Sequence, residues 1–253
     1  MINRQKSFPF LGVLAIAISP VLVGFSPFPS LSQGNANPQE ISLKFPPPKD
    51  RGAPVTTSGG GMRGGSAACV NIREGELSLN ALTPNYNNIA TTASATPTLY
   101  YFIPPTKATS GELVITDEND NEVYETTFTL PSRPGIVKLT LHPKTALVSG
   151  KHYNWSLMII CDAKDRYRDI SSEGKLEYQK LDDATAKSLE TKDALEKAKF
   201  YADKGFWLDT LDNVAQARAE HPADWTELLN SVGLADLSDQ PFSDCCKAKP
   251  EQQ

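Results

Sequence analysis

The chain has 253 residues, among them 25 basic and 30 acidic side chains, and a formal net charge of -5. This length suffices for one moderate domain and a smaller one. The basic residues are scattered among acidic neighbours and form no stripe along the sequence, which argues against nucleic-acid binding.

The N-terminal segment has the pattern of a secretory signal peptide. Arg4 and Lys6 precede an apolar run from Phe8 to Phe25, and small residues follow it. We expect cleavage after Ser32, so that residues 1–32 are the signal peptide. An uncleaved membrane anchor is the alternative, since the run is near the shortest stretch, about 17 residues, that crosses a bilayer. Cleavage would give a periplasmic or extracellular protein without a membrane span.

Residues 33–68 are predicted to form a linker without regular structure. The stretch is rich in Pro, Gly, Ser and Asn, and includes Pro46-Pro47-Pro48 and Gly59-Gly60-Gly61. Such a composition offers few apolar side chains to bury and is typical of extended or disordered segments.

A glycine pattern in this linker, Gly59-x-Gly61-x-x-Gly64, fits the dinucleotide-binding fingerprint literally. That motif binds a pyrophosphate only between a strand and a helix, and neither flanks it here. A flexible lead-in to the next domain is the favoured interpretation. The functional hypothesis kept for this stretch is a ligand contact through Arg51 and Arg63.

Residues 69–178 are predicted to form an antiparallel β-sandwich of the immunoglobulin-like kind. Short runs rich in Val, Ile, Thr, Tyr and Phe recur and are broken by Gly, Pro, Asn and Asp. Six or seven such runs in about 110 residues favour a sandwich. The expected strands are 76–82, 98–103, 112–116, 122–130, 136–141, 152–162 and 175–178.

The four cysteines are Cys69, Cys161, Cys245 and Cys246, which allow three pairings. An oxidising compartment favours disulfides. Adjacent cysteines can bond to each other only through a strained ring, so we favour Cys69 with Cys161. That bond would close a loop of more than 90 residues, a constraint of about 4 to 5 kcal/mol in the loop-entropy model. The tail pair stays open: it could pair locally, or Cys245 or Cys246 could link two chains into a dimer.

Residues 179–234 are predicted to form a helical domain, because the apolar pattern changes to helical spacing after Leu181. Gly205, Pro222 and Gly233 mark helix ends. These short amphipathic helices need a partner surface, which could be each other, the sandwich or another protein. Residues 235–253 are expected to be a flexible tail. The predicted fold class is therefore α+β, with helices at 182–203, 206–220 and 223–232.

Five residues of the helical segment stand at the spacing of one tetratricopeptide repeat: Ala198, Tyr201, Gly205, Ala217 and Pro222. The segment therefore resembles a single hairpin of that type, with Thr210 where the repeat has alanine. One repeat cannot build the usual binding groove. The resemblance implies packing geometry more than function.

Taken whole, the chain combines four motifs: Arg51-Gly52-Ala53-Pro54, a glycine-rich stretch ending at Cys69, Gly150-x-x-Tyr153-x-Trp155 in the strand ending at Cys161, and Tyr201-Ala202-x-x-Gly205-x-Trp207-x-Asp209. In this combination it resembles a cyanobacterial family of exported proteins known as domain of unknown function 928, over most of residues 50–234. Gly174-Lys175 stands where a Gly-Trp pair is expected in such proteins. The resemblance implies export and leaves the activity open.

One loop resembles the opening of a calcium site, with oxygen ligands at Asp117, Asn119 and Asn121. Glu122 stands where that loop needs glycine, and Phe128 stands where it needs the closing glutamate. Asn and Asp are also what a tight hairpin turn requires. A turn is therefore favoured, and calcium is the weaker hypothesis.

The sequence contains no Gly-x-Ser-x-Gly or His-Glu-x-x-His motif, and its three histidines stand in no catalytic signature. No cofactor is expected. The first functional hypothesis is a non-enzymatic envelope protein with a protein partner. The second is a carbohydrate-binding module for envelope polysaccharide, and the third, weaker, is a carboxylate-dependent hydrolase. Aromatic candidates for a sugar contact are Tyr100, Tyr101, Phe102, Trp155 and Trp207, and Trp207 is kept with Arg51 and Arg63 as a ligand-contact hypothesis. The alternative is that these side chains belong to the core, as aromatic residues at alternating strand positions more often do.

Overall fold

The computed structural model describes residues 43–47, 69–70, 72, 75–84, 89–142, 144 and 146–246. The predicted signal peptide, the glycine pattern, Arg51 and Arg63 lie outside the described residues. Within the described part, no helix is long and apolar enough to cross a membrane.

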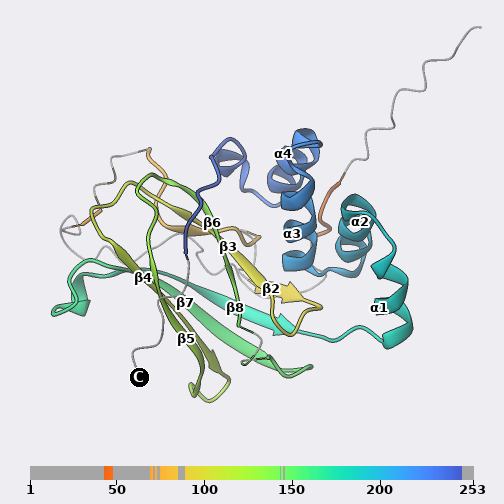
Figure 1. The fold of residues 1–253 in the computed structure, drawn as a ribbon, viewed down its shortest axis with the longest axis horizontal. Helices are drawn as coiled ribbons and strands as arrows, with labels where there is room; N and C mark the ends of the chain where they lie inside the picture. The colour runs from red at the N-terminus through yellow and green to blue at the C-terminus, as the bar shows by residue number, and fades with distance from the viewer. Residues whose placement is uncertain are drawn as a thin grey trace, which may run out of the picture. The chain divides into compact units, whose positions relative to one another are not determined.

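The described residues form two sheets and a set of C-terminal helices (Figure 1), which confirms the predicted α+β class. The strand order is β1-β3-β6 in one sheet and β2-β8-β7-β4-β5 in the other. Neighbouring strands are antiparallel except β2 and β8, which are parallel. The strands are β1 (Asn80–Ala81), β2 (Ile89–Thr92), β3 (Thr98–Ile103), β4 (Ser110–Asp117), β5 (Glu122–Thr129), β6 (Gly135–Thr140), β7 (His152–Ile160) and β8 (Ile170–Tyr178).

The main core contains the inward residues of both sheets. Along β7 the buried residues alternate with less buried ones, as the period of a strand requires, and Trp155 is 1% exposed. Tyr101 on β3 packs edge-to-face against Trp155, with ring centroids 5.5 Å apart. The aromatic contact joins the central strands of the two sheets.

The helices follow β8 (Figure 1), and α3 packs against β2 of the five-stranded sheet and β3 of the three-stranded sheet. Tyr100, next to Tyr101 on β3, points to the opposite side and donates a hydrogen bond to Asp212. The expected helix 182–203 is two helices, because Asp193 and Glu196 form a capping box that starts a new one. The helices are α1 (Asp183–Glu190), α2 (Ala194–Lys204), α3 (Trp207–Ala217) and α4 (Pro222–Ser231), with short 3-10 turns η2 (Arg166–Arg168) and η3 (Ala235–Leu237).

Residues 235–246, within the segment expected to be a tail, pack against both parts of the fold. The Ile136 N–H of β6 donates to the Pro241 carbonyl at 2.7 Å, and the Ser243 N–H donates back to the Ile136 carbonyl at 2.8 Å. The indole of Trp225 on α4 donates to the Ser238 carbonyl at 3.0 Å. This segment therefore connects α4 to the edge of the three-stranded sheet.

Two disulfides are present. Cys69 bonds Cys161, with their Cα atoms 5.2 Å apart, which confirms the predicted pairing of the domain start with the end of β7. Cys245 bonds Cys246, so the local pairing is the one adopted. Since none of the four cysteines is free, the structure gives no support to a disulfide-linked dimer.

Candidate functional site

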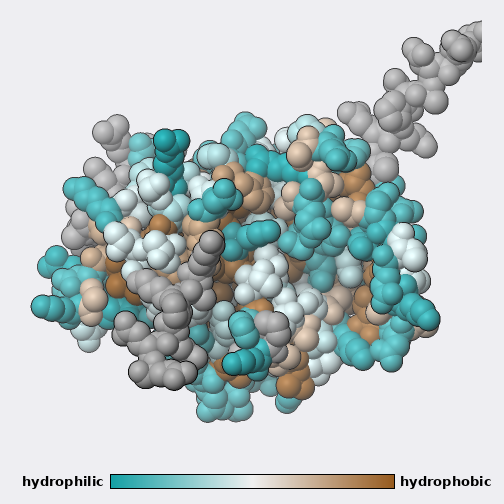
Figure 2. All heavy atoms as spheres, in the orientation of Figure 1, coloured by the Kyte–Doolittle hydropathy of each residue, from teal (hydrophilic) through white to brown (hydrophobic). Residues whose placement is uncertain are grey.

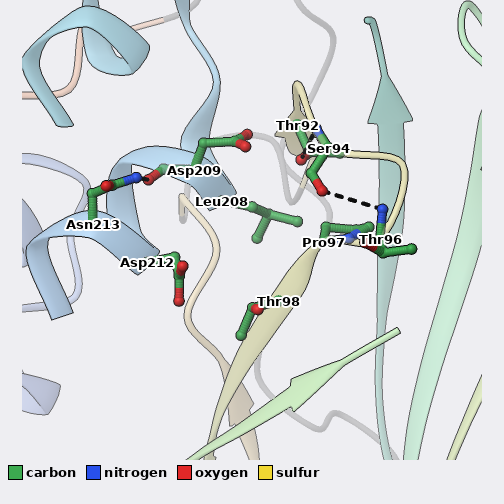
Figure 3. Close-up of a pocket in the computed structure, with 9 residues that line it drawn as sticks. All are labelled: Thr92, Ser94, Thr96, Pro97, Thr98, Leu208, Asp209, Asp212 and Asn213. Atoms are coloured by element: carbon green, nitrogen blue, oxygen red, sulfur yellow. Dashed lines mark hydrogen bonds between the residues drawn. The ribbon is translucent and has the colours of Figure 1, made fainter. Parts of the chain in front are cut away.

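A small polar pocket lies where the loop between β2 and β3 meets the first turns of α3 (Figure 3). Its volume is about 130 Å³. From α3, Asp209 extends toward Thr92, whereas Asp212 lies on the side of Thr98. The lining residues are Thr92, Ser94, Thr96, Pro97, Thr98, Leu208, Asp209, Asp212 and Asn213.

The start of α3 is held on β2 by a side chain from the sheet. Gly205 has a φ of 78°, a left-handed conformation that glycine adopts readily, and it ends α2 so that the chain turns sharply. Phe206, at the cap position of α3, supplies no side-chain cap. Instead Thr91 accepts from the Trp207 N–H at 2.9 Å and donates to the Gly205 carbonyl at 2.5 Å. These bonds place the first turn of α3 over the end of β2.

Asp209, in the first turn of α3, binds the loop that follows β2. Its Oδ2 accepts a hydrogen bond from the Ala93 N–H at 2.8 Å, and Thr92 donates to the carboxylate as well. Burial raises the pKa of Asp209 to about 6, although both hydrogen bonds oppose the shift. Asp209 therefore exchanges a proton within the range of mildly acidic to neutral surroundings, a property that clusters at functional sites.

Asp212 is held by hydrogen bonds from β3 and from its own helix α3. Its Oδ1 accepts from the Tyr100 hydroxyl at 2.7 Å, and its Oδ2 accepts from Gln216 at 2.8 Å. Burial, with the nearby carboxylate adding to it, raises the pKa of Tyr100 well above the usual range. Tyr100 consequently keeps its proton at any physiological pH and remains a donor to Asp212.

Hydroxyl groups complete the lining. The Thr92 hydroxyl accepts from the Ser94 N–H at 3.0 Å, and the Ser94 hydroxyl accepts from the Thr96 N–H at 3.2 Å. These local bonds are typical of turns and hold the loop in shape. The lining side chains include carboxylates, hydroxyls and an amide but no cationic group. Such a surface suits ligands that donate hydrogen bonds, such as hydroxyls or ammonium groups, and disfavours anions.

Trp207, one of the ligand contacts hypothesised from the sequence, belongs to the core. Its side chain is 0% exposed, and its indole N–H donates to the Leu82 carbonyl at 2.7 Å. The other four aromatic candidates for a sugar contact, Tyr100, Tyr101, Phe102 and Trp155, are also buried. These side chains serve packing, so aromatic stacking on a sugar would need other residues.

The calcium candidate residues lie in the turn between β4 and β5. Asp117 accepts hydrogen bonds at its Oδ1 from the N–H groups of Asn119 and Asn121, at 2.8 and 3.0 Å. The Asn121 side chain also donates to both carboxylate oxygens. These bonds lower the pKa of Asp117, with the Asn121 side chain contributing most. The geometry is that of the favoured hairpin turn, and no His, Cys, Asp or Glu cluster suited to a metal occurs among the described residues.

Comparison with known proteins identifies the family. The family model described as Domain of Unknown Function (DUF928) matches residues 58–242. The chain belongs to the DUF928 family. Neither curated proteins nor solved structures gave a match. In this DUF928 protein the matched region includes the disulfide, both sheets, the pocket and the helices, while the tetratricopeptide resemblance of α2 and α3 stays a prediction.

Sequence reasoning did not find the pocket. In the sequence, Asp209 stands out only as the last residue of the motif from Tyr201 to Asp209, and Asp212 belongs to no motif. The spacing of Asp209 and Asp212 is a signal that the sequence does contain, because carboxylates three residues apart on a helix lie on the same side of it. Their partners, just after β2 and on β3, are more than 110 residues away in sequence, and only the fold brings them together.

Proposed function

We propose that this DUF928 protein is exported and acts in the cell envelope as a non-enzymatic binding protein. The observation that carries the proposal is the Cys69–Cys161 disulfide, which joins the first described residues of the β-domain to its central strand β7. Disulfides of this structural kind persist in oxidising compartments and are rare in the cytosol. The signal-peptide pattern at residues 1–32 supports the same location.

Export can be tested on the endogenous protein. We expect cell fractionation to recover it outside the cytoplasm, with a mature N-terminus near Gln33 by mass spectrometry. Maleimide labelling without reductant should modify none of its cysteines, and labelling after reduction should modify all four. A cytoplasmic protein with an intact N-terminus and reactive thiols would refute export.

For the ligand, the pocket supports a hydroxyl-rich molecule such as the terminal sugar of an envelope polysaccharide. Carboxylate and amide groups that converge with hydroxyls on one small cavity match the many donors of a sugar. The volume of about 130 Å³ is below the 300 Å³ or more typical of drug-sized ligand sites. It therefore fits the end of a chain better than a long segment.

The described surface gives less support to a large protein interface. Among the described residues, the exposed large hydrophobic side chains are Val148, Tyr167 and Phe242, which lie on separate segments. On the face shown in Figure 2, hydrophilic side chains surround smaller hydrophobic areas. Stable interfaces usually present a contiguous apolar centre. A protein partner, the alternative occupant, is tested by crosslinking in the native envelope, where recovery of one dominant protein would favour it.

Hydrolysis is a weaker alternative, although Asp209 and Asp212 are paired carboxylates. Glycosidases place their two carboxyl groups on either side of the scissile bond. Here both come from the same face of one helix, and both already accept hydrogen bonds from the fold. Among the described residues that line the pocket, no carboxylate faces these two from the opposite side.

Pull-down on purified peptidoglycan and extracellular polysaccharide tests the ligand. We expect retention by one polymer, loss of retention with Asp212→Asn, and no loss with Asp203→Asn, which changes an exposed carboxylate on α2. No retention on any envelope polymer by folded protein would overturn the carbohydrate assignment. Release of new reducing ends during incubation, abolished by Asp209→Asn, would instead establish the hydrolase alternative.

A further inference from the structure

Residues 43–47, part of the predicted linker, lie against the helices α3 and α4 (Figure 1). Leu43 and Phe45 are 2% and 8% exposed, while Lys44 between them is exposed. Burial at every second position is the pattern of an extended chain with one face inward. The segment thus packs as a short extended peptide rather than as a random lead-in.

Two side chains of α4 bind the backbone of this peptide. The Leu43 N–H donates to Glu227 Oε2 at 3.2 Å, and the Phe45 N–H donates to Ser231 Oγ at 3.1 Å. Two residues of extended chain span about 6.6 Å, and four residues of helix span about 6 Å. Peptide and helix therefore run side by side in matching register, with each inward residue held by one turn of α4.

The inward side chain of Phe45 packs against the indole ring of Trp207 on α3. Its ring packs edge-to-face on Trp207 at a centroid distance of 5.1 Å. The Trp207 indole cannot turn away without losing its bond to the Leu82 carbonyl. Lys44 lies 4.0 Å from Glu227, which adds a charge preference at the outward position. Trp207, Glu227 and Ser231 together are called the docking face below.

We propose that the docking face is a recognition site for an extended peptide with two large apolar residues flanking a basic one, filled within the chain by residues 43–47. Three features define the site: two side-chain acceptors on α4 that hold an extended backbone, an aromatic contact for one apolar side chain, and a carboxylate beside the outward position. The occupant that the chemistry fits is a partner protein with an exposed apolar–basic–apolar segment. The docking face shares no residue with the lining of the polar pocket, so the proposal does not depend on the ligand proposed above.

The test removes the two apolar side chains that fill the docking face and supplies the same segment as a separate peptide. Full-length mature protein with Leu43→Ser and Phe45→Ser is titrated with a fluorescent peptide of residues 40–48, Glu-Ile-Ser-Leu-Lys-Phe-Pro-Pro-Pro. We expect saturable binding, weakened about tenfold or more in the unsubstituted protein, where the tethered segment competes at high effective concentration. The same peptide with serine at both apolar positions should not bind.

Matched variants on α4 locate the binding. Ser231→Ala in the emptied protein should weaken the peptide several-fold, whereas Asn230→Ala, an exposed neighbour, should not. No binding by a variant whose circular dichroism is native, or equal binding of the serine peptide, would overturn the proposal.

If the double variant does not fold, the unsubstituted protein with excess peptide carrying a photoreactive group at the Phe45 position replaces it. Crosslinks within α3 and α4 support the site, and crosslinks confined elsewhere overturn it.

Discussion

Replacing Asp209 by Asn should change how the stability of the protein depends on pH. Burial raises the pKa of this carboxyl from 3.8 to about 6 in the folded protein. The folded state therefore binds the proton more tightly than the unfolded state does. The stability from this group is fully present below pH 3.8 and is lost as the pH rises through 6. Asn keeps an acceptor for the Ala93 N–H but has no proton to lose.

The magnitude follows from the shift. Each unit of pKa corresponds to 1.36 kcal/mol, so a shift of about two units gives about 3 kcal/mol. Between pH 4 and pH 7 the free energy of unfolding of the Asp209→Asn variant should rise relative to that of the unsubstituted protein by most of this amount, about 2.4 kcal/mol. The comparison cancels other groups, such as Asp117 and Asp182, whose lowered pKa values act in the opposite direction.

Urea unfolding at a series of pH values and constant ionic strength measures this difference. Asn213→Ala is the control, because it changes the same pocket without adding or removing a charge and should give an offset that does not vary with pH. Carbon NMR of the Asp209 carboxyl should show a midpoint near pH 6. A difference between variant and parent that stays constant from pH 4 to pH 7 would refute the reasoning.

Three further changes test the framework around the pocket. Cys69→Ala with Cys161→Ala should lower the free energy of unfolding by up to about 4.6 kcal/mol, from the loop-entropy relation at a sequence separation of 92; an unchanged urea midpoint would contradict this. Thr91→Val should cost about 1 to 2 kcal/mol through loss of the cap on α3, and Thr91→Ser should restore most of it. Gly205→Ala should destabilise by about 1 to 2 kcal/mol because its φ is 78°; no loss in thermal unfolding would mean that the turn between α2 and α3 rearranges.

The parts of the fold that could be predicted are those that depend on residues close together in the sequence. The alternation of apolar residues along β7 is visible in the sequence and was predicted correctly. The Cys69–Cys161 pairing was also predicted, although the structure contains the bond between the adjacent Cys245 and Cys246 that the argument from ring strain had disfavoured. The missed division at Asp193 was also local, since Asp193 and Glu196 have the spacing of a capping box. Reading the long apolar pattern as one helix gave too little weight to that signal.

The missed strand β2 has a different cause. Ile89–Thr92 is only four residues long, and its parallel pairing with β8 joins positions more than 80 residues apart. Ile and Thr favour strands, but four residues are too few to show the alternation of a strand, so the pairing with β8 decides. The pocket depends on β2, which is why the site could not be found before the fold.

The position of the pocket also suggests an experiment that identifies the class of ligand. Thr91, Thr92 and Ala93 join the sheet to α3, so a ligand that bridges the loop and the helix binds only the assembled protein. Such a ligand stabilises the folded state by about 2.7 kcal/mol at 100 times its dissociation constant, which thermal unfolding detects without any assay of activity. Because Asp209 loses its proton near pH 6, an ammonium ligand that pairs with the carboxylate should raise the melting temperature more at pH 7 than at pH 5. A neutral sugar donates to the carboxylate without needing its full charge and should show a smaller difference. Comparing the two pH values across a panel of amines and sugars therefore distinguishes the two ligand classes that the lining admits.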